Sequence, residues 1–253
     1  MPADALQILL RGLCLPGMAA RYEEAPAAAE SGNWGYRQFL LHLCETEAAQ
    51  RQTRKRERLL RQSGLPAGKT WATLEEGKLP GKIRRLLPTL LEGGFVKRAE
   101  SVIAFGLPGR GKTHFLAALG RELILRHDYE VYFTPTFKLV QRLLKAKAEL
   151  KLETELKRLD RFDAVICDDI GYVQQTREEM EVFFTFLAER YERRCVMITS
   201  NLVFSKWDQI FKDPMTTMAA VDRLVHHAVI LEFDNESVRA NEARAKVQSK
   251  SAG

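Results

Sequence analysis

Apolar residues recur along this chain with two different periods, and the change falls near residue 65. Before that point the spacing is helical. The first expected helix has one short apolar face, made up of Leu6, Ile8, Leu9 and Leu13. A loop rich in Pro, Gly and Ala follows, and a second helix begins near Gly35 and continues into a basic stretch. The pattern predicts a small all-helical domain over residues 1–62.

Residues 63–80 show neither the helical nor the strand spacing of apolar residues, and they contain several turn-forming residues. They are Gly64, Pro66, Gly68, Gly77 and Pro80, and they predict a linker or a strap across the next domain. Beyond this segment, short apolar strands at 101–106, 131–134, 164–167 and 195–199 alternate with helices at 114–125, 137–159 and 178–193. Such alternation predicts an α/β fold with a parallel sheet flanked by helices. We expect this domain over residues 81–245 and a flexible tail at 246–253.

Composition narrows the class without identifying the activity. Of the 253 residues, 45% are hydrophobic and 28% charged, a globular balance that excludes wholesale disorder. The net charge of +6 is compatible with a polyanionic partner. The cysteines are scattered, at Cys14, Cys44, Cys167 and Cys195. Without metal-binding spacing, a signal segment or a membrane-spanning run, we expect a soluble cytoplasmic protein that does not contact membranes.

Residues 106–113, GLPGRGKT, match the phosphate-binding pattern GxxxxGK followed by Ser or Thr. An apolar strand precedes them and an amphipathic helix follows, which argues against a chance glycine-rich loop. Backbone N–H groups of such a loop surround phosphates, Lys112 reaches the β- and γ-phosphates of ATP, and the Thr113 hydroxyl ligates Mg²⁺. The predicted nucleotide-binding residues are Gly106, Pro108, Gly109, Arg110, Gly111, Lys112, Thr113 and His114.

A second acidic motif, Asp168-Asp169, ends the apolar run at residues 164–167. Asp168 is placed to hold Mg²⁺, and Asp169 to polarise the water that attacks the γ-phosphate. Most ATPases of this architecture carry Glu at the second position. Asp is one methylene shorter, and a displacement of about 1 Å can cost on the order of 100-fold in rate. We therefore predict slow ATP hydrolysis, suited to a timed switch. We also expect DNA or a partner to stimulate this ATPase.

Three later segments complete a recognisable set. Residues 198–201 follow the next strand and end in Asn201, as a sensor-1 element does, so Asn201 would help Asp169 to position water. Residues 220–227 resemble the box-VII segment, in which Arg223 either reaches a neighbouring subunit's ATP or forms an ordinary salt bridge. Residues 235–239 resemble a sensor-2 element that ends in Arg239. With the extra helices at 137–160, the set resembles the initiator and helicase-loader branch of the AAA+ ATPases.

Within that branch, residues 6–239 resemble the IstB-like transposition helper proteins of IS21-type insertion sequences. The resemblance is carried by GLPGRGKTHFLAALG, LVQRLLKAKAE, LKRLDRFDAVICDDIGY, AERYERRCVMITSNLVFSKWDQIF and DRLVHHAVILEF. The DDIGY segment agrees with this family, so Asp169 departs only from the general AAA+ pattern. The resemblance implies a protein that binds ATP, Mg²⁺ and double-stranded DNA with little sequence preference. It also implies a homo-oligomer that marks or remodels target DNA and recruits or stimulates the transposase of the same element.

Two basic surfaces are candidates for DNA contact. One lies on the second helix, at Arg51, Arg54, Lys55 and Arg58, and the other on the extra helices, at Lys138, Arg142 and Lys145. Each is either an ordinary solvated helix face or a row of phosphate contacts, which give affinity without sequence choice.

Several residues and two rival functions stay open. The indole of Trp71 packs either on adenine or in the core, and the adjacent His226 and His227 are better explained as structural residues than as metal ligands. A replicative helicase loader would use the same machinery on a different client. A P-loop small-molecule kinase is the rival from another class, and the sensor-type segments argue against it.

Overall fold

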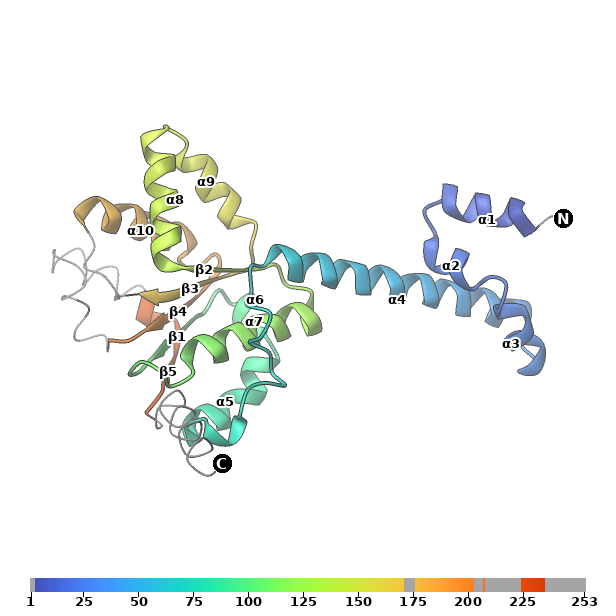
Figure 1. Cartoon of the computed structure of the whole chain (residues 1–253), viewed down its shortest axis with the longest axis horizontal. Coiled ribbons are helices and arrows are strands. Elements are labelled where there is room, and N and C mark those ends of the chain that lie inside the picture. The colour runs from blue at the N-terminus through green and yellow to red at the C-terminus, as the bar shows by residue number, and fades with distance from the viewer. Residues whose placement is uncertain (1–2, 171–175, 203–206, 208–223, 235–253) are drawn as a thin grey trace, which may run out of the picture. The chain divides into compact units, whose positions relative to one another are not determined.

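The computed structural model describes residues 3–170, 176–202, 207 and 224–234 (Figure 1). The chain divides into two compact units, Met1–Arg58 and Leu59–Gly253. We call them the amino-terminal unit and the α/β unit. None of the described helices combines the length and the apolar character needed to cross a bilayer.

The amino-terminal unit is helical, and its helices are α1 (Ala3–Gly12), α2 (Pro16–Arg21), α3 (Ala25–Ser31) and α4 (Tyr36–Gln62), the last of which runs past the unit boundary. The expected loop after the first helix was wrong, because α2 and α3 occupy it. Both helices carry proline in their first turn. Proline is compatible with that position, because the first N–H groups of a helix have no intrahelical acceptor.

One buried carboxylate joins two helices of the amino-terminal unit. Glu47 on α4 accepts hydrogen bonds from the backbone N–H groups of Gly17 (2.6 Å) and Met18 (3.2 Å) at the start of α2. It also accepts one from the Arg51 guanidinium at 2.7 Å, and Arg51 donates to the Cys14 carbonyl at 2.8 Å. A Cβ on Gly17 would lie 2.8 Å from the Glu47 Cα. The close approach of α2 and α4 therefore requires glycine at this position.

Residues 63–80 pack against the α/β unit and contain one turn of 3₁₀ helix, Glu76–Lys78. Leu65, Trp71 and Leu74 lie against its apolar core, and the Ser63 carbonyl accepts from the N–H of Phe133 at 2.7 Å. The segment therefore contributes apolar side chains to the core, as a strap would.

The α/β unit contains a sheet of five parallel strands in the order β2-β3-β4-β1-β5 (Figure 1). The strands are β1 (Ser101–Phe105), β2 (Val131–Pro135), β3 (Ala164–Ile170), β4 (Cys195–Ser200) and β5 (Ala228–Glu232). The predicted parallel sheet is confirmed. β3 continues through Asp168 and Asp169, and its register with β4 shifts between Cys167 and Ile170.

Helices cover both faces of this sheet, as predicted. They are α5 (Gly81–Leu91), α6 (Gly94–Lys97), α7 (Lys112–His127), α8 (Thr136–Ala148), α9 (Leu152–Asp160) and α10 (Arg177–Arg190). Successive strand residues point to opposite faces, so Val102 joins an apolar cluster with Phe115 of α7, while Ile103 joins another with Leu143 of α8. The two clusters of buried side chains hold the strands, and therefore the strand ends, in fixed positions.

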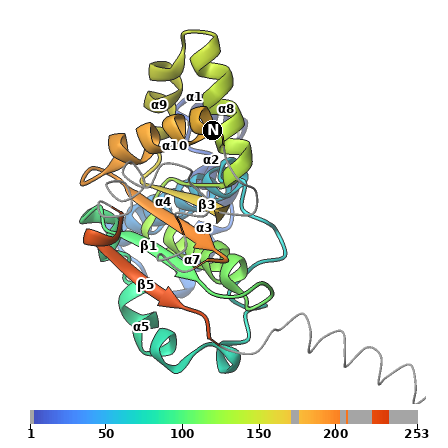
Figure 2. The ribbon, with the colours of Figure 1, turned by 90° about the vertical axis from the view of Figure 1, so that its left-hand side faces the viewer.

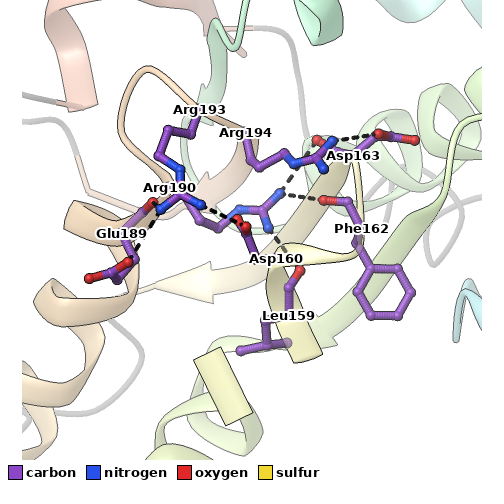
Figure 3. Close-up of polar contacts among 8 residues, drawn as sticks. All are labelled: Leu159, Asp160, Phe162, Asp163, Glu189, Arg190, Arg193 and Arg194. Carbon is purple, nitrogen blue, oxygen red and sulfur yellow. Dashed lines mark hydrogen bonds and ion pairs between the residues drawn. The ribbon is translucent and has the colours of Figure 1, made fainter. Parts of the chain in front are cut away.

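A buried arginine joins the amino-terminal ends of two strands to α10. The Arg190 guanidinium donates to the carbonyls of Leu159 (2.9 Å) and Phe162 (2.9 Å), as Figure 3 shows, and to that of Cys195 (3.0 Å). Burial lowers the pKa of Arg190 to about 10, so the side chain remains charged at neutral pH. Two more exposed ion pairs lie beside it, Arg193–Asp160 and Arg194–Asp163.

Candidate functional site

The carboxyl ends of β1, β3 and β4 meet at one edge of the sheet, because the strands are parallel and Phe105 pairs with Ser200. The phosphate-loop sequence begins there, at Gly106, whose φ is +148°. A Cβ on Gly106 would lie 2.3 Å from the Phe233 carbonyl oxygen, so only glycine fits. The loop is thus fixed between β1 and the residue that follows β5.

The loop ends at the amino terminus of α7. Gly111 precedes the helix in a left-handed conformation, with φ of +92°, and α7 begins at Lys112. A Cβ on Gly111 would meet nothing within 4 Å, so this side of the loop is open. The first N–H groups of a helix and the positive end of its dipole favour an anion, so this position fits a phosphate group.

Three predicted residues are joined by one chain of hydrogen bonds. The buried Lys112 ammonium donates to the carbonyls of Gly106 (2.6 Å) and Leu107 (3.0 Å) and to Asn201 Oδ1 (2.8 Å). The Asn201 amide in turn donates to Asp169 Oδ1 at 2.7 Å. The lysine of the loop is therefore connected through Asn201 to the second acid of β3.

Thr199 is a site residue that the sequence prediction missed. Its hydroxyl donates to Asp168 Oδ1 at 2.7 Å and accepts from the backbone N–H of Asp169 at 2.7 Å. Asp169 has a φ of +63°, so its backbone is in the left-handed region, and Thr199 is almost wholly buried. The signal was present, because Thr199 lies in β4 two residues before Asn201, and side chains two residues apart in an extended segment point to the same side.

The other predicted loop residues have different surroundings. Thr113 lies half-buried in the first turn of α7, and Pro108 is exposed on the loop. Arg110 donates to the Phe233 carbonyl at 2.9 Å. His114 Nε2 lies 3.1 Å from both the Thr70 carbonyl and the Thr73 hydroxyl of the strap. Arg110 and His114 thus help to hold the loop and the strap in place.

Trp71 is half-buried and packs against the apolar core. Its ring centroid lies 6.3 Å from that of Phe115, and its indole N–H donates to Glu76. Of the two interpretations left open by the sequence, the structure favours core packing.

Four further residues considered in the sequence analysis are not placed in the site by the structure. Arg223 and Arg239 lie outside the described residues. The imidazole rings of His226 and His227 are 4.3 Å apart, and His227 lies 3.6 Å from Glu192. Among the residues that the structure describes, no three His, Cys, Asp or Glu side chains gather as a metal site.

The candidate DNA-contact residues fall on α4 and α8. Arg54, Lys55 and Arg58 are exposed on α4, whereas Arg51 pairs with Glu47 inside the amino-terminal unit. On α8, Lys138 and Lys145 are exposed, and Arg142 donates to the Tyr132 hydroxyl at 2.9 Å. Arg51 and Arg142 therefore also have structural contacts.

A cavity of about 420 Å³ lies at the opposite end of the strands, where β1 and β4 begin. Its lining comes from α10 and from the amino-terminal ends of β1 and β4, including Ser101 and Val196. The phosphate loop and the two acids lie at the carboxyl ends, so this cavity is not the nucleotide site.

Comparison with known proteins connects this geometry to a family. A sequence model of the IstB-like ATP-binding proteins matches residues 8–246. The chain belongs to the IstB-like ATP-binding protein family. An insertion-sequence ATP-binding protein of Sinorhizobium fredii is 39% identical over 94% of this chain and 80% of its own length. An IS21 ATP-binding protein of Pseudomonas aeruginosa is 36% identical over 94% of this chain and 90% of its own.

Similarity to solved structures indicates the fold class of this IstB-like chain. The DnaC helicase loader matches with a TM-score of 0.50 at 21% identity, over 61% of this chain and 92% of its own. AMPPCP-bound DnaA from Aquifex aeolicus matches with a TM-score of 0.54 at 17% identity, over 74% of this chain and 57% of its own. These similarities confirm the predicted AAA+ P-loop ATPase fold.

Proposed function

We propose that this IstB-like protein is an ATP-driven switch that assembles on double-stranded DNA with little sequence preference. In this proposal it marks or remodels the DNA, recruits or stimulates the transposase of its element, and resets when ATP is hydrolysed. The observation that carries the proposal is the hydrogen-bond chain from Lys112 through Asn201 to Asp169. It connects the group that would meet the γ-phosphate with the group that would polarise water.

The roles of the site residues follow from their positions. Lys112 and the loop N–H groups bind phosphate oxygens, and Thr113 and Asp168 would hold Mg²⁺. When bound, Mg²⁺ neutralises charge on the phosphates. Thr199 orients Asp168, while Asn201 and Asp169 position the attacking water.

The hydrogen bonds of Lys112 suggest how the switch operates. Its ammonium now donates to two loop carbonyls and to Asn201. An ammonium has three protons, so a phosphate oxygen can be bound only by replacing one of these acceptors. Replacement of Asn201 would leave its amide and the Asp169 carboxylate free to rearrange around water.

Oligomer formation and DNA contact would depend on residues outside the hydrogen-bonded site. Arg223 would act in trans on a neighbouring subunit's ATP, and Arg239 would act as a sensor within its own subunit. The exposed cations on α4 and α8 would contact phosphates. Such contacts release counterions, so duplex binding should weaken steeply as salt is raised.

Binding of random-sequence duplexes with ATP, ADP or no nucleotide tests the proposal. We expect cooperative, ATP-dependent binding that is lost in Lys112→Ala and kept in Lys82→Ala, which removes the same charge from an exposed position on α5. Absence of duplex binding in every nucleotide state would contradict a DNA switch. Capture of a hexameric helicase rather than the transposase would then favour a loader, and ATP turnover that responds to a metabolite rather than to DNA would favour a kinase.

A further inference from the structure

The hairpin of α8 and α9 projects from the sheet, and its tip lies away from the core in both views (Figures 1 and 2). The buried residues of α8 are confined to its first eight positions, Thr136, Leu139, Val140 and Leu143. On α9 the buried residue is Leu159, near the far end of the helix. The tip, residues 145–151, is therefore not held by the apolar core of the α/β unit.

Leu150 at this tip is the most exposed large apolar side chain in the described part of the α/β unit, at 94%. Its backbone is left-handed, with φ of +56°. It closes the carboxyl end of α8, where the N–H of Leu150 donates to Lys147 and the N–H of Lys151 donates to Ala146. Glycine or asparagine is usual at such a position, since a branched side chain is strained there.

Leu150 thus combines an exposed apolar side chain with a backbone conformation that is unfavourable for leucine. The side chain of Leu150 buries almost no surface, and its backbone conformation favours other residue types. Folding gains nothing from leucine here, because glycine or asparagine would satisfy the turn and expose less apolar surface. Strain and exposed apolar surface at a projecting tip indicate a function for the side chain.

The surroundings of Leu150 favour a polyanion. The tip reads KAKAELK, with three lysines against Glu149, for a net charge of +2 over residues 145–151. Lys145 and Lys151 lie 3.9 and 3.2 Å from Glu149, and their side chains are 79% and 68% exposed. Exposed ion pairs of this kind are weak, so phosphates can replace the carboxylate. A protein-docking patch would need further large apolar side chains beside Leu150, but no other is exposed within residues 145–151, and the adjacent residues in the sequence are Glu149 and Lys151.

We propose that Leu150 is a wedge that enters the minor groove of duplex DNA and partly unstacks a base step, while Lys145 and Lys151 bind the phosphates on either side. Apolar wedges kink the duplex toward the major groove in this way without reading its sequence. The inference rests on the proposed DNA-binding function and assigns the deforming contact to one residue.

The test uses the full-length protein with ATP and a duplex that carries 2-aminopurine, together with end-to-end energy transfer on a doubly labelled duplex. We expect the wild-type protein to raise the 2-aminopurine fluorescence and to bring the duplex ends closer. Leu150→Asn should lose both signals, yet bind duplex within about threefold of wild type because phosphate contacts supply the affinity. It should also melt at a higher temperature, since asparagine tolerates the left-handed conformation. Leu150→Met keeps an apolar side chain and should retain both signals.

Lys145→Ala is the control for charge. It should weaken binding and reduce the salt dependence by about one phosphate contact, with the bend unchanged at saturation. Equal unstacking and bending by wild type and Leu150→Asn would overturn the wedge while leaving the ATP-dependent DNA switch intact. Lack of duplex binding by the wild-type protein would overturn both. Normal DNA signals with lost transposase capture in Leu150→Asn would make the tip a protein contact instead.

Discussion

Over residues 5–58, the amino-terminal unit buries Gly17, Ala25, Leu43 and Glu47, so one of its four buried residues is a carboxylate. Among its larger apolar side chains only Leu43 is buried over these residues, and several others, including Leu9 and Leu13, are exposed. The α/β unit instead has two extensive apolar clusters, one on each face of the sheet. Since burial of apolar area is the main favourable term in folding, the second unit has far more to stabilise it.

This difference changes what a buried polar group does in each unit. In the α/β unit, Arg190 supports the amino-terminal ends of β3 and β4, while Lys112 and Thr199 lie at the carboxyl ends. Stability and chemistry can therefore be altered separately there. In the amino-terminal unit, Glu47 joins α2 to α4 with little apolar burial to assist it. A change at Glu47 should open that unit alone.

The largest effect on stability is expected from Arg190→Leu. The substitution leaves the carbonyls of Leu159, Phe162 and Cys195 without this donor, and each lost bond to a charged group is worth about 1.5–3 kcal/mol. We expect the free energy of unfolding of the α/β unit to fall by about 3 kcal/mol or more, measured by urea denaturation.

Arg193→Leu is the matched control, because its ion pairs with Asp160 and Glu189 involve a side chain that is 58% exposed. Exposed pairs contribute about 0–1 kcal/mol. Equal losses in the two variants would contradict the structural role of Arg190.

Thr199→Val should affect the chemistry of the α/β unit more than its stability. Valine keeps the shape but removes the hydroxyl that donates to Asp168 and accepts from the N–H of Asp169. Displacement of either carboxylate by about 1 Å should slow ATP hydrolysis on the order of 100-fold. We expect kcat to fall with little change in the KM for ATP, because Lys112 and the loop are untouched, and more Mg²⁺ to be needed for half-maximal rate.

Thr199→Ser separates chemistry from packing. Serine restores the hydroxyl and loses a methyl group, so turnover should recover to near the wild-type rate. A serine variant as slow as valine, or a loss confined to KM, would show that Thr199 does not position the acids.

The sequence predicts those elements of the fold and site that are determined by a short stretch of residues. Four buried strands were predictable because each is a continuous apolar run, and the phosphate loop because its glycines and lysine stand at fixed spacing. β5 was missed, and it is only partly buried along its length at the sheet edge. Pro16 and Pro26 suggested a loop, although a proline in the first turn is compatible with a helix.

The features that the sequence did not predict depend on contacts between residues that are far apart in the sequence. The acceptors of Arg190 include Leu159, and the donors to Glu47 include Gly17, about 30 residues away in each case. Nothing in the composition around either residue specifies such a partner. Thr199 is an intermediate case. Its place two residues before Asn201 could be found from the sequence, but only the pairing of β3 with β4 brings it to Asp168.

A smaller effect, confined to the amino-terminal unit, is expected from Glu47→Gln. The amide can still accept from the N–H of Gly17, but the charge-assisted bonds, including that from Arg51, are lost. We expect local opening of α2 to become easier by about 1–2 kcal/mol, with the α/β unit unchanged. Native-state hydrogen exchange at the amides of Gly17 and Met18 measures it. Glu45→Gln, at an exposed position on the same helix, should have no effect.

The same carboxylate should make the amino-terminal unit sensitive to acid. Burial alone would raise the pKa of Glu47, but hydrogen bonds from Arg51, Met18 and Gly17 outweigh it and hold the pKa below its ordinary value of 4.5. The unfolded chain then binds a proton more readily than the folded unit, so Glu47 contributes stability above pH 4.5 that is lost as the pH falls through the folded pKa. The amides of Gly17 and Met18 should lose protection there in the wild-type protein and much less in Glu47→Gln. An equal acid response in both proteins would place the sensitive group elsewhere, and would leave α2 and α4 joined by packing at Gly17 rather than by charge.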